Sequence, residues 1–258
     1  MFEHVTVKQL TPDVWLLDED HSASGYLVVG FSLALVIDTM CGKENLFDIV
    51  RTITQKPVIV VNTHGHGDHV GGNWAFENVY MNPVDLPLTD EMLSDPEFIE
   101  FCNANKVSFP PFKPIHGGDT IDLGGLTAEI IELPGHTPGC ICVLLREERI
   151  LFTGDGINRW LWMQLPHSLS LAQLVESLNK IEWVTQKADR ILHGHNRDFD
   201  NISLFYTMRD CALELINQHG HEVSDADEPY EWFGGVDKKH PLKDKSGVIC
   251  YSMDKLPE

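Results

Sequence analysis

The sequence predicts an α/β fold in a single domain that spans residues 1–258, and three observations favour it. Short apolar runs typical of strands recur along the chain, with amphipathic runs typical of helices among them. No low-complexity segment or linker interrupts this pattern. The length lies near the upper end of what one α/β domain usually holds and suffices to bury a large core.

The first half of the chain begins with expected strands and ends in an irregular stretch. The expected elements are strands at 14–17, 26–29 and 33–37, a turn at 30–32, and a helix at 43–52. Residues 57–61 are apolar throughout, as is typical of a strand buried on both faces. The proline-rich stretch 82–117 contains a helix near 95–105 and is long for a connection, so we expect it to form part of a binding wall.

The second half continues with strands and two helices. The expected strands are a strand and turn at 119–125, a strand at 128–133, a hairpin at 141–145 and 149–152, and a strand at 190–193. Ser170 and Gln173 match a capping box ahead of apolar residues that share one helical face. Over residues 201–258 we expect a helix at 201–218, a polar loop at 225–245 and an edge strand at 248–251.

Charge and composition limit the function classes. The 19 basic and 39 acidic residues leave a formal net charge of −20, which repels phosphate backbones and anionic lipid headgroups. No apolar run approaches the ~20 residues of a membrane span, and the N-terminus does not have the pattern of a signal peptide. We therefore expect a cytoplasmic protein with free thiols that acts on a small molecule, with no nucleic acid or membrane as partner. A homodimer stays open.

Four separated segments place metal-competent side chains next to glycine at the ends of expected strands. They are His64-Gly65-His66-Gly67-Asp68-His69, Gly135-His136, Gly154-Asp155 and His193-Gly194-His195. Loops at the ends of strands are where α/β proteins build their sites. Imidazole and carboxylate suit Zn²⁺, Fe and Mn²⁺, and five histidines with two aspartates are too many for one four-coordinate ion. Two ions could use all seven groups if one carboxylate bridges them.

The order HxHxDH, GH, GD and GH resembles the metallo-β-lactamase fold superfamily over residues 14–200. The resemblance implies a four-layer αββα sandwich with the metals at one edge, between two sheets. It also implies a first metal site of His64, His66 and His136, a second site of Asp68, His69 and His195, and Asp155 as the bridging ligand. Because the last ligand of the family follows a glycine, we expect His193 beside the site and not in it.

The implied function is hydrolysis of an ester-like bond in a small molecule by a hydroxide that bridges two divalent ions, zinc first, with iron or manganese as alternatives. Asp68 is the expected catalytic residue, because a carboxylate that binds metal and accepts hydrogen bonds can orient the hydroxide and carry its proton. Lactones, thioesters and other small esters are the candidate substrates. The alternatives are a phosphodiesterase on the same fold and a persulfide-dioxygenase-like enzyme with one iron held by His64, His136 and Asp155.

Differences between this sequence and known branches of the superfamily reduce the number of candidate substrates. Acyl-homoserine lactonases often have a tyrosine three residues after the bridging aspartate, where this chain has Asn158. The tail at 196–258 is short and partly acidic, unlike the helical C-terminal domain of glyoxalase II. True β-lactamases of this fold do not normally carry the Asp155-type ligand and are exported, so β-lactam hydrolysis is not expected.

Residues near the motifs have two interpretations each. Trp160, Trp162 and His167 follow Asp155 in an expected loop and either wall an apolar pocket or pack under the next helix. The loops 82–117 and 156–168 are the expected pocket walls. His21 and Ser22 lie between early strands, and we expect an ordinary solvated loop there.

Overall fold

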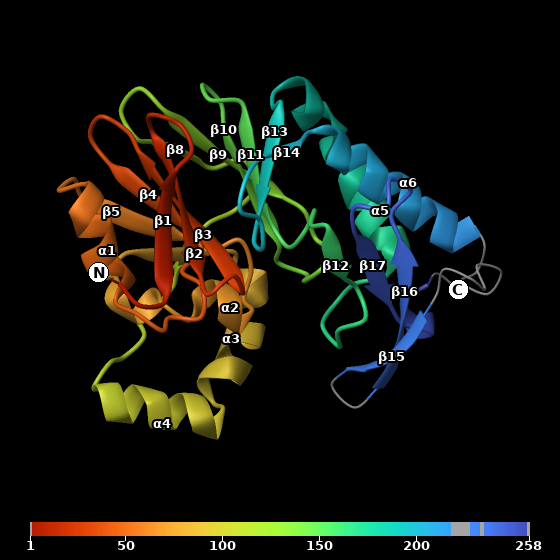
Figure 1. Cartoon of the computed structure of the whole chain (residues 1–258), viewed down its shortest axis with the longest axis horizontal. Helices are drawn as coiled ribbons and strands as arrows, with labels where there is room; N and C mark the ends of the chain where they lie inside the picture. The colour runs from red at the N-terminus through yellow and green to blue at the C-terminus, as the bar shows by residue number, and fades with distance from the viewer. Residues whose placement is uncertain (1, 218–227, 233–234, 257–258) are drawn as a thin grey trace.

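The computed structural model describes residues 2–217, 228–232 and 235–256, and it has four layers (Figure 1). Two sheets pack face to face, and helices cover the outer face of each sheet. The predicted α/β class and the αββα sandwich are therefore confirmed. None of the helices in these residues is long and apolar enough to cross a membrane.

The first sheet contains seven strands in chain order. They are β1 (Val5–Gln9), β2 (Val14–Glu19), β3 (Ala23–Val29), β4 (Ala34–Ile37), β5 (Val58–Val61), β6 (Val79–Met81) and β7 (Lys113–Pro114). The first four are antiparallel neighbours, whereas β5 runs parallel to both β4 and β6. The carboxyl end of β5 leads into the segment that begins at His64, at the edge where α/β sheets form sites.

The second sheet contains six strands in the order β14-β13-β11-β10-β9-β8. They are β8 (Thr120–Asp122), β9 (Thr127–Glu132), β10 (Ile141–Leu145), β11 (Ile150–Gly154), β13 (Arg190–His193) and β14 (Asp200–Asn201). β13 runs parallel to β11, and Gly154 pairs with His193. The segments that contain Asp155 and His195 therefore leave the sheet side by side.

Three apolar cores hold the layers together. Between the sheets, Tyr26 of β3 packs on Phe152 of β11, with ring centroids 5.2 Å apart. The buried face of α1 (Leu46–Ile53) covers the first sheet, and α5 (Leu171–Ile181) and α6 (Ser203–Asn217) cover the second. Burial of these faces supplies the main stabilising term, at roughly 25 cal/mol per Å² of apolar surface.

Side-chain caps set the helix starts and correct one boundary. The helix expected at 43–52 begins later, because the Asn45 side chain accepts hydrogen bonds from the backbone N–H groups of Phe47 and Asp48. The capping box of Ser170 is present at the start of α5, as predicted.

The stretch 82–117 holds more helix than the sequence predicted. Asp95 caps α4 (Pro96–Asn105), close to the expected helix, but α3 (Leu86–Leu93) was not predicted. Its one proline, Pro87, resembled a loop residue, although proline in the first turn of a helix loses no hydrogen bond. The remaining short helices are α2 (Gly67–Val70), η1 (Asn73–Ala75), η2 (Pro83–Asp85), η3 (Glu182–Gln186) and η4 (Met253–Lys255).

The C-terminal region departs most from the sequence prediction. The expected loop at 225–245 contains β15 (Glu228–Trp232) and β16 (Gly235–Pro241), while residues 225–227 and 233–234 lie outside the described residues. β17 (Val248–Tyr251) is not an edge strand, because it pairs with β16 and with β12 (Trp160–Trp162), which was expected as loop. The polar strand β16 is held by its partner β17, and local sequence did not reveal that pairing.

Candidate metal centre

The HxHxDH segment turns sharply between β5 and the short helix α2. His64 and His69 are fully buried, whereas the side chain of Asp68 is 38% exposed. The turn brings the ring centroid of His69 to within 4.0 Å of that of His64. One segment therefore delivers four candidate ligands, His64, His66, Asp68 and His69, to the edge of the first sheet.

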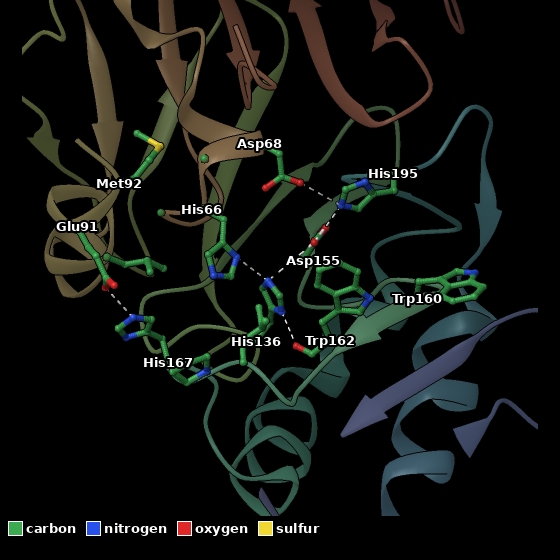
Figure 2. Close-up of a pocket in the computed structure, with 15 residues that line it drawn as sticks. His66, Asp68, Glu91, Met92, His136, Asp155, Trp160, Trp162, His167 and His195 are labelled. Atoms are coloured by element: carbon green, nitrogen blue, oxygen red, sulfur yellow. Dashed lines mark hydrogen bonds and ion pairs between the residues drawn. The ribbon is translucent and has the colours of Figure 1, made fainter. Parts of the chain in front are cut away.

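Three histidines, His64, His66 and His136, form what we call the inner group. Nδ1 of His66 lies 3.0 Å from Nε2 of His64 and 2.9 Å from Nε2 of His136. Nδ1 of His136 lies 2.7 Å from the carbonyl oxygen of Trp162, which can only accept, so this nitrogen is the donor. Nε2 of His136 is therefore left to face the ring of His66 (Figure 2).

Asp68, His69 and His195 form what we call the outer group. Oδ2 of Asp68 lies 3.7 Å from Nε2 of His69 and 3.6 Å from Nε2 of His195. His69 donates from Nδ1 to Asp38 at 2.8 Å, and His195 donates from Nδ1 to the carbonyl of Ser22 at 2.6 Å. Both rings are thereby oriented with Nε2 toward Asp68.

Asp155 lies between the two groups (Figure 2). Its Oδ2 is 3.1 Å from Nε2 of His195 and 3.8 Å from Nε2 of His136, while its Oδ1 is 3.6 Å from Nε2 of His69. The Asn158 side chain donates to Oδ1 at 3.0 Å and fixes the plane of the carboxylate. The structure therefore brings all seven predicted residues together, although their role as metal ligands stays a prediction.

Two glycines of the motifs are required by the site itself. Gly154 has φ 48°, and a Cβ there would lie 2.1 Å from Oγ1 of Thr63. A Cβ on Gly194 would lie 2.4 Å from Cε1 of His69 and 2.6 Å from Oδ1 of Asp155. A larger residue at position 154 would clash with Thr63, and one at position 194 would displace His69 and Asp155.

The inner group is electrically neutral. Burial, followed by repulsion from the neighbouring rings, holds the pKa of His64 and of His66 well below the ordinary value. Burial also lowers the pKa of His136. Three neutral imidazoles whose nitrogens converge in a buried site can offer lone pairs to a cation without first losing a proton.

The outer group is rich in negative charge. The Asp155 carboxylate raises the pKa of His195 to about 9. Burial opposes a proton on His69, but the carboxylates around it, beginning with Asp68 and Asp38, raise its pKa well above the ordinary value. Both shifts show a local field that stabilises positive charge at this place.

A cation fits this donor set. Nε2 of His69 is buried and has no hydrogen-bond partner among the described residues, which is rare for a buried ring nitrogen. Three sets of donor atoms lie within 4.8 Å of one another: His64, His66 and His136; His64, His69 and Asp155; Asp68, His69 and His195. Imidazole with carboxylate is a donor set typical of Zn²⁺, Fe and Mn²⁺.

A cavity of about 790 Å³ opens onto this cluster. Its apolar lining comes from both predicted walls: Leu88 and Met92 from α3, and Trp160, Trp162, Leu165 and Pro166 from 156–168. Glu91 and His167 also line it and join the two walls through a contact of 3.0 Å (Figure 2). His66, Asp68, His136, Asp155 and His195 line the same cavity.

The model of the metallo-β-lactamase superfamily matches residues 19–195, which contain all seven candidate ligands. This chain belongs to the metallo-β-lactamase superfamily. The superfamily is one of metal-dependent enzymes, and relatives of this chain are named as hydrolases. The chain is therefore a superfamily hydrolase with side chains that could bind metal.

Relatives and solved structures agree with this placement. Acyl-coenzyme A thioesterase MBLAC2 of Gallus gallus is 28% identical, and the match covers 80% of this chain and 83% of that protein. Hydroxyacylglutathione hydrolase of Francisella philomiragia is 27% identical over 65% of this chain and 60% of that protein. The structure of a metallo-β-lactamase from Pontibacter korlensis has a TM-score of 0.63 at 21% identity, covers 81% of this chain and 99% of its own, and shows a common fold.

The sequence placed His193 beside the site and not in it. In the structure His193 is buried and in none of the three donor sets, and its Nε2 lies 3.4 Å from Asp200. Ser22 lies in an exposed turn, as expected, but its carbonyl also accepts from Nδ1 of His195, which the sequence did not predict. Neighbouring His21 instead contacts Asp18 at 2.5 Å, away from the cluster.

Asp38 lies directly after β4 and was not predicted as part of the site. Its Oδ2 accepts from His69 and from Oγ1 of Thr63, whose oxygen lies 3.1 Å from Nδ1 of His64. Asp38 thus orients one histidine of each group. Part of the signal was available, because Asp38 ends an apolar strand as the motif residues do, but its neighbours are Ile37 and Thr39 and not glycine.

Proposed function

We propose that this chain hydrolyses a small ester-like bond, a thioester first, with two divalent ions held by His64, His66, Asp68, His69, His136, Asp155 and His195. Zinc is the first candidate for both ions, with iron or manganese as alternatives. The observation that carries the proposal is the convergence of seven donor groups beneath a cavity of about 790 Å³ with apolar walls.

The two groups divide the work of binding. The inner group would hold one ion through three neutral rings, the outer group would hold the second, and Asp155 would serve both. When bound, two such ions would supply Lewis acidity, which would lower the pKa of water and polarise a substrate carbonyl.

Asp68 is the proposed proton carrier. Its side chain is 38% exposed and lines the cavity, so it can contact a substrate there. No hydroxyl or thiol nucleophile is needed from the chain. Cys140 and Cys142, for example, are buried thiols whose pKa burial raises, which disfavours the reactive thiolate.

The cavity supports an apolar acyl group as the substrate half that binds beside the ions. Its walls of leucine, methionine and tryptophan suit an acyl chain, and the chain's net charge of −20 disfavours a nucleic-acid backbone. Asn158 disfavours a lactonase of the acyl-homoserine type, because its side chain binds Asp155 and Trp160 N–H and does not enter the cavity lining. Two relatives whose names describe acyl-coenzyme A and hydroxyacylglutathione hydrolysis point the same way.

The test is a substrate panel on protein of measured metal content. Thioesters of increasing acyl length, lactones, simple esters and phosphodiesters are compared on zinc-loaded enzyme at physiological salt. We expect two ions per chain and the highest kcat/KM on a thioester. A stable content of one iron that added zinc does not raise would instead favour the dioxygenase alternative, and dominant phosphodiester cleavage would replace the ester assignment.

A wall variant locates the acyl group. Leu88→Ser makes one wall polar, so we expect KM to rise for long acyl chains and to stay unchanged for acetyl thioesters. The matched control is Leu213→Ser, because Leu213 is an exposed leucine on α6, outside the lining of this cavity. Equal effects of the two variants on long chains would place the acyl group elsewhere.

A further inference from the structure

Asp85 is a buried acid outside both ligand groups, at the residue before α3. It is 1% exposed, which is unusual for a carboxylate. An aspartate at this position usually caps its helix by accepting from the first-turn N–H groups. The side chain of Asp85 makes no such bond, so its burial serves something other than the start of α3.

The carboxylate of Asp85 accepts three hydrogen bonds from two other segments. Oδ2 accepts from the backbone N–H of Gly65 at 3.0 Å and from Oγ1 of Thr137 at 2.6 Å. Oδ1 accepts from the backbone N–H of Gly139 at 2.6 Å. Burial raises the pKa of this carboxyl, and the three donors offset part of that cost by stabilising the charged form.

These donors are neighbours of the inner group. Gly65 lies between His64 and His66, and Thr137 follows His136 directly. The two segments come from opposite sheets, because one follows β5 and the other follows β9. Asp85 is thus a side chain that ties the two segments, through the backbone N–H groups of Gly65 and Gly139 and the hydroxyl of Thr137, and not through the imidazole rings.

A further contact joins the Gly65 segment to α3, the helix that forms one wall of the cavity. Oγ1 of Thr89, one turn into α3, lies 3.3 Å from the carbonyl oxygen of Gly65. On the same helix, Leu88, Glu91 and Met92 line the cavity. Asp85 and Thr89 therefore contact the segment that carries the inner histidines, while their neighbours on α3 form one wall of the cavity.

We propose that Asp85 is a positioning residue for the inner metal ion, because it holds the segments around Gly65 and Thr137 so that His64, His66 and His136 converge. The inference rests on the proposed function, since it needs two ions to be bound. Replacing a residue that orients the metal ligands without binding the metal itself typically weakens metal affinity by roughly 10- to 100-fold.

The experiment is the variant Asp85→Asn, which keeps the shape but turns one acceptor oxygen into a donor that faces another donor. Zinc affinity is measured by competition with a chromophoric chelator, and histidine NMR signals of His136 and His195 report which ion leaves. We expect affinity for the inner ion to fall roughly 10- to 100-fold while the outer ion stays near its wild-type affinity. Amide hydrogen exchange at Gly65 and Gly139 should accelerate, which reports the lost acceptor without any activity assay.

The matched control is Asp90→Asn, an exposed acid on the same helix, which should change neither affinity. If wild type does not bind two ions, the proposed function fails. If wild type binds two ions and Asp85→Asn keeps both at wild-type affinity, or weakens both equally, this inference alone is overturned. Should Asp85→Asn not fold, Thr137→Val and Thr137→Ser decide, because only the valine variant should weaken the inner ion, and equal affinities would overturn the role.

Discussion

The inner and outer groups reach the same cavity but are built differently. The inner group consists of three imidazoles with lowered pKa values, and His64 and His136 are almost completely buried. The outer group contains Asp68 and His195, whose side chains are 38% and 31% exposed, and its histidines have raised pKa values. In the proposed two-ion site, the inner group would therefore bind its ion through preorganised neutral rings, whereas the outer group would depend on charge and lie closer to the solvent.

The largest effect is expected where the two groups share a ligand. Asp155→Ala removes the only carboxylate in contact with histidines of both groups among the described residues, so it should lose more than one ion. Activity on the best substrate should fall to the detection limit. Metal content after gel filtration is the measurement, with Asp90→Ala as control. Retention of one ion at wild-type affinity would show that Asp155 belongs to one group only.

A pair of histidine variants tests whether the groups are separable. His195→Ala should lose the outer ion and keep the inner one, because His195 contacts Asp68 and Asp155 and no inner histidine. His193→Ala should leave metal content nearly unchanged but destabilise the fold by roughly 1–3 kcal/mol, because Asp200 and the N–H of His195 lose a buried partner. Elemental analysis and thermal unfolding distinguish the two. The reverse pattern in metal content would exchange the roles of His193 and His195.

An intermediate effect is expected from Asp38→Asn. The variant should weaken the outer ion roughly 10- to 100-fold, because Asp38 orients His69 directly. The inner ion should weaken less, since Asp38 reaches His64 only through Thr63. The two affinities are measured by chelator competition. Equal losses would mean that Asp38 supports the site as a whole and would weaken the division into groups.

The sequence predicted the candidate site better than it predicted the C-terminal fold. The site depends on short motifs whose glycines, such as Gly154 and Gly194, are required by local sterics and are visible in the sequence. α3 escaped prediction because the proline in its first turn resembled a loop residue. β16 escaped because its pairing with β17 depends on the partner strand and not on local sequence. Asp85 escaped for the same reason as β16, since 52 residues separate it from Thr137 and 54 from Gly139.

The smallest expected effect is on histidine protonation, and through it on stability, in protein treated with a chelator. NMR titration should give His195 a pKa of about 9, because the Asp155 carboxylate raises it. The rings of His64 and His66 should stay neutral as the pH falls well below the ordinary histidine pKa. A raised pKa adds stability that is fully present below the unfolded-state value of about 6.5 and is lost as pH rises through about 9. Lowered pKa values act in the opposite sense, because their stabilisation is present above about 6.5 and is lost as pH falls through the folded values.

Stability of the chelated protein should therefore decline on both sides of neutrality, with His195 contributing on the alkaline side and the inner rings on the acid side. His195→Gln should remove part of the alkaline decline and leave the acid limb unchanged, because the glutamine does not titrate. Chemical denaturation at a series of pH values measures both limbs. If His195 and the inner rings titrated together near 6.5, the two groups would not differ in electrostatics, and the outer ion would have no special dependence on charge.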